Sequence, residues 1–305
     1  MTPKSKKRAV RRTKTSRPSR RPAPAASTKP APPPRLKKLA PGERRISAYG
    51  WHPDLPDHRD YSYAVPARVT AAPLPALVDL RPQCPPVYNQ LQLGSCTANA
   101  IAAAIQFEQM KQSLPVFGPS RLFIYYNERV MEHSITFDHG AQIRDGIKSV
   151  AKQGVCPETM WTYDDKNNGD NACRACPYAK KPTPTCYKTA AKHLVMNYQR
   201  LTPTLDELRG CLASGYPFVF GFTVYTAFES REVAKSGVLS LPTAKEKVMG
   251  GHAVMAVGYN DSTSQFIVRN SWGPDWGQEG YFMMPYDYLT NSNLADDFWT
   301  IRMVE

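Results

Sequence analysis

The amino-acid sequence predicts an α+β protein with two lobes, a helical one followed by one made of strands. Between residues 96 and 152, three stretches place apolar residues at the 3.6-residue spacing that is typical of helices. From residue 194 onwards, runs of β-branched and aromatic residues dominate, most clearly in residues 218–225, and such runs favour strands. Because the helices precede the strands instead of alternating with them, the order indicates the α+β class.

The expected helices and strands follow one another in chain order. The first helix begins at Cys96 and ends before Pro115; the second spans residues 119–132 with Ser120 as its cap; the third runs from 143 to 152 and stops at Gly154. A short helix is expected at 204–214. Strands are expected at 194–198, 218–225, 253–259, 265–269 and 279–284. A tight turn at 260–262 joins two of these strands and makes them neighbours.

The positive charge of the chain is concentrated at its N-terminus. The formal net charge is +13, but residues 1–46 hold 16 of the 39 Lys and Arg and one of the 26 acidic residues. The remaining 23 basic and 25 acidic residues nearly balance. Nine prolines and few large apolar residues predict that this basic tail is disordered. It is either a solvated linker or a contact for nucleic acid, an anionic membrane or another polyanion.

Three regions follow from the composition. After the tail, residues 47–75 combine prolines with Trp51, Tyr61 and Tyr63, which predicts an extended arm in ordered contact with the folded domain. This arm either patches the surface or crosses the active-site cleft as a pro-segment. The domain itself is expected at 76–305, with an insertion-like loop at about 155–190.

Seven cysteines lie at 84, 96, 156, 173, 176, 186 and 211. Four of them fall in the insertion-like loop, where zinc binding, disulfides and free thiols all stay open, although a single CxxC is weak evidence for zinc. No signal peptide is recognisable and no apolar run approaches the roughly 18 residues of a membrane helix. We therefore slightly favour a cytoplasmic location with reduced thiols. Cys211 is expected to be a small core residue.

Cys96 is the first candidate catalytic residue. It follows a polar turn and begins an Ala/Ile-rich helix, where free backbone N–H groups and the helix dipole favour a negative charge. This position should lower the thiol pKa from its free value of roughly 8.5 and make Cys96 a nucleophile. Such a nucleophile needs a base from elsewhere in the chain.

His252 is the best candidate for that base. It stands at the mouth of an apolar strand, and Asn270 ends the neighbouring strand, so that the two side chains should meet. Asn270 would orient the imidazole, and Trp272 would cover their hydrogen bond and exclude water. Gln90 precedes Cys96 by six residues and could donate to an oxyanion beside the Cys96 backbone N–H.

These residues resemble the papain-like cysteine peptidases. Three blocks match the family in the same order: Gln90 with Gly94-Ser95-Cys96, His252-Ala253-Val254 with Gly258-Tyr259, and Asn270-Ser271-Trp272-Gly273 continuing to Tyr281. The resemblance covers about residues 76–305. It implies a papain-like two-lobe fold with a helical N-terminal lobe, an antiparallel β-barrel-like C-terminal lobe and the active site in the cleft between them. It also implies a Cys96–His252 ion pair.

Several positions depart from the family pattern and suggest its bacterial, xylellain-like branch. Thr97 follows the nucleophile where Trp is usual, Leu93 replaces a disulfide cysteine, and Gly251 stands where Asp or Asn often precedes the histidine. His252 and Asn270 lie 156 and 174 residues after Cys96, beyond the usual roughly 130–150. The insertion-like loop accounts for the surplus.

The sequence thus predicts a monomeric cysteine endopeptidase that hydrolyses polypeptides through a Cys96 thioester, without cofactor or metal. The resemblance places Gly140, Ala253 and Trp272 along the substrate cleft. Two other functions stay open: a papain-like transpeptidase or amidase, and a binding protein that works through its basic tail.

Overall fold

The computed structural model describes residues 49–70, 72–166 and 173–305. The predicted basic tail, residues 1–46, lies outside these described residues. All elements below belong to one compact unit of the chain.

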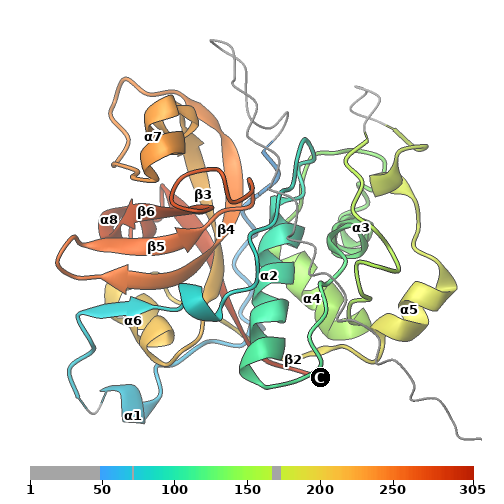
Figure 1. The fold of residues 1–305 in the computed structure, drawn as a ribbon, viewed down its shortest axis with the longest axis horizontal. Helices are drawn as coiled ribbons and strands as arrows, with labels where there is room; N and C mark the ends of the chain where they lie inside the picture. The colour runs from blue at the N-terminus through green and yellow to red at the C-terminus, as the bar shows by residue number, and fades with distance from the viewer. Residues whose placement is uncertain (1–48, 71, 167–172) are drawn as a thin grey trace, which may run out of the picture. The chain divides into compact units, whose positions relative to one another are not determined.

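Three helices form the first lobe: α2 (Cys96–Lys111), α3 (Arg121–Met131) and α4 (Ile143–Gln153). The Ser120 hydroxyl caps α3 by accepting a hydrogen bond from the Phe123 N–H at 3.2 Å. Gly154 ends α4 with a φ of 72°. Helices α3 and α4 lie on one side of α2 and strands β3 to β6 on the other (Figure 1). This central position explains why thirteen of the sixteen α2 residues are buried.

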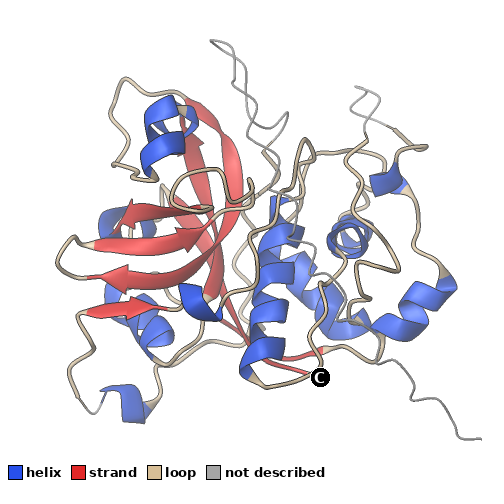
Figure 2. Cartoon of the chain, viewed as in Figure 1, coloured by secondary structure: helices blue, strands red, loops and turns tan. Residues whose placement is uncertain are grey.

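The second lobe is built on an antiparallel sheet with short helices around it, whereas the first lobe is mainly helical (Figure 2). Its strands run in the order β2-β7-β3-β4-β5-β6, and β1 pairs with β4. The strands are β1 (Leu77–Asp79), β2 (Val195–Arg200), β3 (Phe218–Tyr225), β4 (Val248–Asn260), β5 (Gln265–Arg269), β6 (Tyr281–Pro285) and β7 (Ala295–Val304). The predicted α+β class is confirmed, and β3 and β5 cover the expected residues.

Two features of the sheet differ from expectation. The sheet is not closed, because β2 and β6 lie at the two ends of the strand order and do not pair with each other within the described chain. The lobe that was expected to be barrel-like is therefore an open antiparallel sheet. Strand β7 was not predicted, although it pairs with both β2 and β3 inside the sheet. Asp296 and Asp297 interrupt its apolar pattern, and Asp297 has a φ of 59° beside an irregularity in the β3–β7 register.

The remaining helices are short, except α6 (Leu205–Ala213), which was expected. They are α1 (Ala67–Thr70), α5 (Pro184–Ala190), α7 (Arg231–Ser236) and α8 (Tyr286–Leu289). Helix α5 lies inside the predicted insertion-like loop. Its start follows ordinary rules, since Thr183 accepts from the Cys186 N–H at 3.3 Å and Pro184 occupies the first turn.

The cysteines of this loop are in two states. Cys173 and Cys176 form a disulfide, so the expectation of reduced thiols is wrong for this pair. Cys156 and Cys186 are free and buried. Within the described residues, no group of His, Cys, Asp and Glu is arranged to hold a metal ion. Cys211 is fully buried, as expected for a small core residue.

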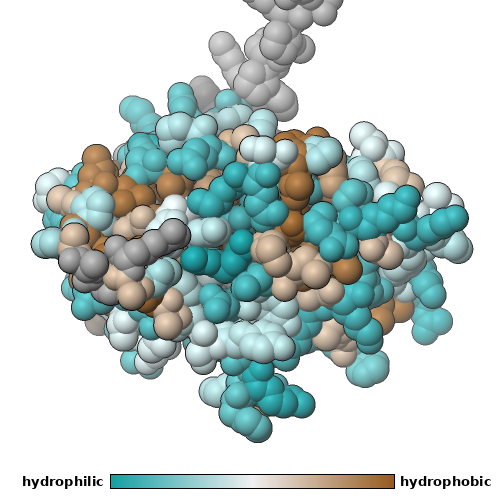
Figure 3. Space-filling view, turned by 90° about the horizontal axis from the view of Figure 1, so that it is seen from below, coloured by the Kyte–Doolittle hydropathy of each residue, from teal (hydrophilic) through white to brown (hydrophobic). Residues whose placement is uncertain are grey.

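The face of the molecule drawn in Figure 3 is mainly polar. Figure 3 shows hydrophilic residues over much of one face, with apolar residues scattered between them, as is ordinary for folded proteins. Among the described helices, none combines the length and apolar character needed to cross a membrane.

Candidate active site

Cys96 lies at the first turn of α2, as the sequence predicts, and its side chain is fully buried. The turn before it is held by several hydrogen bonds. The Asn99 amide donates to the Ser95 carbonyl at 2.9 Å, and the Ser95 hydroxyl lies 2.7 Å from the Tyr163 hydroxyl. The sulfur is therefore attached to a rigid helix terminus whose backbone N–H groups favour negative charge.

His252 and Asn270 are brought together by the neighbouring strands β4 and β5. The His252 Nε2 lies 2.9 Å from the Asn270 Oδ1, and both residues are buried. The His252 Nδ1 is buried without a hydrogen-bond partner among the described residues. A buried polar atom without a hydrogen-bond partner costs free energy, so the presence of this unpaired nitrogen requires an explanation.

Aromatic rings enclose the imidazole. The Trp272 ring lies 5.3 Å from the His252 ring, and the Phe222 and Phe228 rings lie 5.8 and 6.1 Å from it. These rings exclude water from the His252–Asn270 hydrogen bond, which strengthens it.

Gln90 is held from both ends of its amide. Its Oε1 accepts from the Ser271 hydroxyl at 2.6 Å, and its Nε2 donates to the Leu93 carbonyl at 2.9 Å. The Gln90 N–H also donates to the Ser271 carbonyl at 2.8 Å. Gln90 thereby lies between the turn before Cys96 and the residue after Asn270.

Residues 49–52 of the predicted arm pass directly over this site. The Ala141 N–H donates to the Gly50 carbonyl at 2.7 Å, and the Trp51 N–H donates to the Gly251 carbonyl at 2.9 Å. The His52 N–H then donates to the Ala141 carbonyl at 3.2 Å. The arm backbone is thus bonded to the turn before α4 on one side and to β4 on the other.

Glycines allow this close approach. A Cβ on Gly50 would lie 1.6 Å from the Gly94 carbonyl oxygen, and a Cβ on Gly140 would lie 1.9 Å from the Gly50 carbonyl oxygen. Gly140 also has a φ of 82°, which favours glycine. The arm can therefore cross only where three glycine backbones meet.

Tyr49 covers the other end of the site. Its hydroxyl donates to the Glu229 Oε1 at 2.7 Å. Its ring lies 5.8 Å from the His252 ring and 6.4 Å from the Trp272 ring. Tyr49 and Gly50 together separate the candidate catalytic residues from solvent.

This cover changes the protonation of the site. Burial raises the pKa of Cys96 to about 12, although the backbone N–H groups of Ala253 and Gly50 act in the opposite direction. Burial also lowers the pKa of His252 to about 4, against the effect of its hydrogen bond to Asn270. Burial by the arm therefore acts against both the expected lowered thiol pKa and the expected Cys96–His252 ion pair in this covered form.

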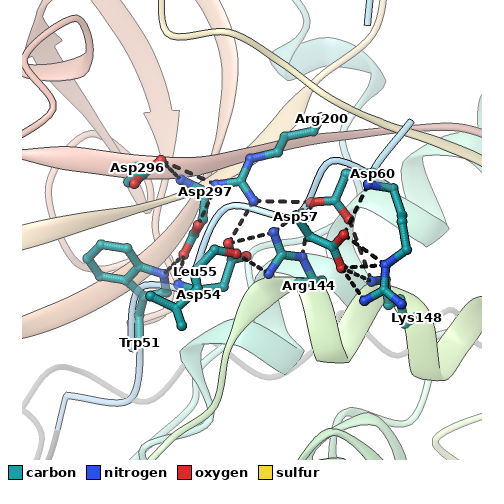
Figure 4. A network of polar contacts seen from close by, with 11 residues as sticks. Trp51, Asp54, Leu55, Asp57, Asp60, Arg144, Lys148, Arg200, Asp296 and Asp297 are labelled. Atoms are coloured by element: carbon teal, nitrogen blue, oxygen red, sulfur yellow. Dashed lines mark hydrogen bonds and ion pairs between the residues drawn. The ribbon is translucent and has the colours of Figure 1, made fainter. Parts of the chain in front are cut away.

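Buried ion pairs fix the arm beyond the crossing (Figure 4). Asp54 lies 2.9 Å from the Arg144 guanidinium of α4 and 2.6 Å from that of Arg200, at the end of β2. Asp60 lies 2.6 Å from Arg144. The Trp51 Nε1 donates to the Asp297 Oδ2 at 2.9 Å. The arm is thus attached to both lobes through buried charged groups.

Thr97 lies in the protein core. It is fully buried, and its hydroxyl donates to the Glu128 Oε1 of α3 at 2.7 Å. Where the family usually has Trp, this chain therefore has a threonine that links α2 to α3 through a hydrogen bond.

The fold and this site define a papain-type cysteine peptidase, and comparison with known proteins agrees. Residues 126–300 match the family model described as papain family cysteine protease. The chain belongs to this family. An uncharacterised peptidase C1-like protein of Acanthamoeba polyphaga mimivirus is 41% identical over 280 residues, covering 84% of this chain and 87% of the relative.

Solved structures point to the same family. Xylellain, a cysteine protease from Xylella fastidiosa, is 47% identical with a TM-score of 0.80, over 88% of this chain and 100% of that one. Procathepsin B S9 from Trypanosoma congolense is 17% identical with a TM-score of 0.66, over 86% and 87% of the two chains, and so shares the fold. The predicted resemblance to the papain family and its xylellain-like branch is confirmed.

The backbone groups that bind the arm were not predicted from the sequence. The Ala141 N–H and carbonyl and the Gly251 carbonyl make these bonds, whereas Gly140 shapes the turn beside them. Gly221 was also missed; it lies in β3 opposite Ala253 and against the Trp51 ring. Backbone groups carry no side-chain signature, so only the aligned position of the turn at 138–141 could have indicated them.

Proposed function

We propose that this protein is a cysteine endopeptidase in which Cys96 is the nucleophile and His252 the base. The observation that carries the proposal is the His252 Nδ1, which is buried and unpartnered while the Nε2 is occupied by Asn270. The backbone N–H of the next residue, Ala253, hydrogen-bonds the Cys96 sulfur and contributes to its pKa. The free nitrogen therefore belongs to a residue beside the thiol.

The reaction follows from these positions. His252 takes the thiol proton, and the Cys96 sulfur attacks a peptide carbonyl. Gln90 and the Cys96 backbone N–H stabilise the oxyanion, and His252 then protonates the leaving amine. Water hydrolyses the thioester. Asn270 keeps the imidazole in place throughout, while Gly140, Ala253 and Trp272 line the path of the substrate.

Replacement of the nucleophile tests this proposal. Cys96→Ala should abolish peptide hydrolysis and labelling by a thiol-directed epoxide. Cys84→Ala is the matched control, because this half-buried thiol lies outside the site. Hydrolysis that persists in Cys96→Ala would refute the assignment.

We further propose that the arm is a pro-segment that keeps the enzyme latent. It covers the site, and it presents the Gly50 amide N–H, not a carbonyl carbon, to the Cys96 sulfur. The arm is therefore not attacked while it blocks substrate. Gly50→Ala should displace it, because the new methyl group would overlap the Gly94 carbonyl.

The expected result is faster Cys96 labelling and faster peptide hydrolysis by full-length Gly50→Ala. Gly118→Ala is the control, because no atom lies within 4 Å of a Cβ built there. A folded Gly50→Ala chain that is no more active than the wild type would make the arm purely structural.

Two predictions from the sequence need separate tests. A transpeptidase or amidase would use the same residues with another acceptor, and product analysis in the presence of added amines distinguishes it from a hydrolase. The charge of residues 1–46 supports contact with a polyanion. Deleting these residues should then weaken low-salt binding to a polyanion, and a chain that sediments as more than a monomer would correct the expected monomeric state.

A further inference from the structure

The first part of the insertion-like loop, residues 157–166, lies against the turn that carries Gln90. The Trp161 carbonyl accepts from the hydroxyl of Ser120 at 2.6 Å, which attaches the loop to the start of α3. Two residues further along, the Tyr163 side chain reaches the turn itself. Nothing in the proposed reaction so far uses this loop, so its contact with the turn needs an account.

The Tyr163 hydroxyl lies between two groups of that turn. It donates to the Gln90 carbonyl at 2.6 Å and lies 2.7 Å from the Ser95 hydroxyl. Since the Tyr163 proton is directed to the carbonyl, the Ser95 hydroxyl donates to Tyr163. Ser95 in turn accepts from the Asn99 amide nitrogen at 3.1 Å. One chain of hydrogen bonds thus runs from α2 through Tyr163 to the backbone of Gln90.

Arg121, the first residue of α3, stacks on Tyr163 and holds the neighbouring carbonyl. Its guanidinium carbon lies 4.0 Å from the centroid of the Tyr163 ring, and its Nη1 donates to the Asn89 carbonyl at 3.0 Å. The Glu158 carboxylate accepts from the Arg121 Nε at 3.0 Å and from the Nη2. Because this two-pronged pairing fixes the guanidinium plane, two consecutive backbone carbonyls of the turn are held by two immobilised donors.

These contacts act on the backbone of Gln90, whereas Ser271 and Leu93 bond its side chain. The direction of an amide side chain depends on where its own backbone stands. Stabilisation of an oxyanion in turn requires its donor at a fixed place, and a small displacement is costly in rate. A carbonyl that loses its donor gains free energy by moving to another partner, and the Gln90 amide would move with it.

We propose that Tyr163 and Arg121 are positioning residues that fix Gln90 as the oxyanion donor. The proposal rests on the peptidase function given above. Neither residue acts on the substrate, since each works through the backbone of the turn. The insertion-like loop thereby acquires a role in the reaction: it supplies the hydroxyl that holds the Gln90 carbonyl.

Tyr163→Phe tests the proposal, because it removes the hydroxyl and keeps the ring on Arg121. The variant is made in the more active of the full-length wild type and Gly50→Ala, and kcat, KM and Cys96 labelling by a thiol-directed epoxide are measured. We expect kcat to fall about tenfold at nearly constant KM and labelling, since the nucleophile is intact while the donor is displaced. Arg121→Lys keeps the charge but loses the fork and the stacking, and should show the same pattern.

Coupling to Gln90 distinguishes positioning from a purely structural role. In Gln90→Ala, which lacks the donor, adding Tyr163→Phe should change kcat by less than about twofold. Tyr187→Phe is the matched control, because its hydroxyl donates to Asn127 at 2.9 Å and joins α5 to α3 instead. An equal loss of kcat with and without the Gln90 side chain, or an unchanged kcat in Tyr163→Phe or Arg121→Lys, would overturn the proposal.

Nuclear magnetic resonance separates this proposal from the peptidase function, because it needs no turnover. The side-chain amide signals of Gln90 in the ¹⁵N-labelled chain are identified by their absence from Gln90→Ala. They should shift in Tyr163→Phe and stay in place in Tyr187→Phe. Shifted signals without Cys96-dependent hydrolysis of any peptide would refute the function and keep the positioning of Gln90. Cys96-dependent hydrolysis with unshifted signals would refute the positioning and keep the function.

Discussion

Gln90 shows how a single side chain of the site depends on both lobes. Its amide oxygen is bonded to Ser271 after β5, and its amide nitrogen to Leu93 before α2. These two bonds fix the direction of the amide donor before the reaction begins. Gln90 therefore loses no side-chain freedom in the transition state, as a flexible residue would. Any shift between the lobes would move it.

Replacing this donor should slow catalysis without removing the nucleophile. Gln90→Ala is expected to lower kcat by about 10² to 10³ in an opened variant such as Gly50→Ala. Labelling of Cys96 should stay near its original rate. Gln92→Ala provides the control, since Gln92 is exposed on the same turn. Equal loss of labelling and hydrolysis would instead indicate a displaced Cys96.

Glu108 carries a testable pH dependence of stability. Both carboxyl oxygens are buried without hydrogen-bond partners among the described residues, and burial raises the pKa from 4.5 to about 7, partly offset by Lys111. The folded chain thus holds a proton that the unfolded chain releases near pH 4.5. This contribution is complete below pH 4.5 and is lost as the pH rises through 7.

Glu108→Gln should remove that dependence. Between pH 4.5 and 7, the wild type should lose on the order of 3 kcal/mol of unfolding free energy that the variant does not lose. Urea unfolding of both chains at several pH values measures the difference, in which other titrating groups cancel. Parallel pH curves for the two chains would contradict the prediction.

Single residues of the candidate site could be predicted where a side chain carries the chemistry and its position matches a sequence motif of the family. Cys96, His252, Asn270 and Gln90 are of this kind; the structure pairs His252 with Asn270 and bonds Gln90 to Leu93, in the turn before Cys96. The pKa of Cys96 could not be predicted, because it depends on burial by a distant segment of the chain. Gly221 could not be predicted either, because its role is to leave room for the Trp51 ring.

At the level of elements, the arm is attached more strongly than its proline-rich sequence suggests. Arg144 of α4 is nearly buried between Asp54 and Asp60 of the arm, and its Nη1 also bonds the Leu55 carbonyl at 2.5 Å. Removing one partner of such a buried pair leaves uncompensated charge, which is costly. The ion pairs therefore fasten the arm to the domain at points that are remote from the catalytic residues.

Arg144→Met should release the arm without touching the site. Breaking a buried pair costs about 3–5 kcal/mol, so Cys96 labelling of the full-length chain should rise by at least about a hundredfold. Lys166→Ala is the matched control, because its pair with Asp164 is exposed. If Arg144→Met unfolds at the wild-type temperature and is labelled no faster, the ion pairs do not hold the arm.

The elements that sequence patterns predicted are those with a continuous periodic pattern. Helices α2 to α4 and α6 and strands β2 to β6 were predicted in this way, with β3 and β5 covering the expected residues. Strand β7 was missed because Asp296 and Asp297 replace apolar residues, and their cost is met by Arg200, a partner distant in sequence. The barrel-like lobe was implied by the family resemblance, because the local sequence pattern contains no information on whether β2 and β6 meet.

For the whole molecule, the covered and open forms should differ in how labelling depends on pH. In the wild type the Cys96 pKa is about 12, so the rate should rise roughly tenfold per pH unit from 6 to 10 without levelling off. In Gly50→Ala, water reaches the site and the rate should level off within this range. Mass spectrometry of the labelled chains provides the measurement, and a plateau in the wild type would contradict a covered thiol.

The three glycines that meet above Cys96 also affect how easily the Cys96 sulfur is oxidised. Peroxides and other oxidants attack the thiolate far faster than the thiol. A chain whose nucleophile is neutral and shielded should pass through oxidising surroundings with its sulfur intact, and become vulnerable only once it can act. The contact of Gly50 with Gly94 and Gly140 thus determines both the resistance of Cys96 to oxidation and its activity.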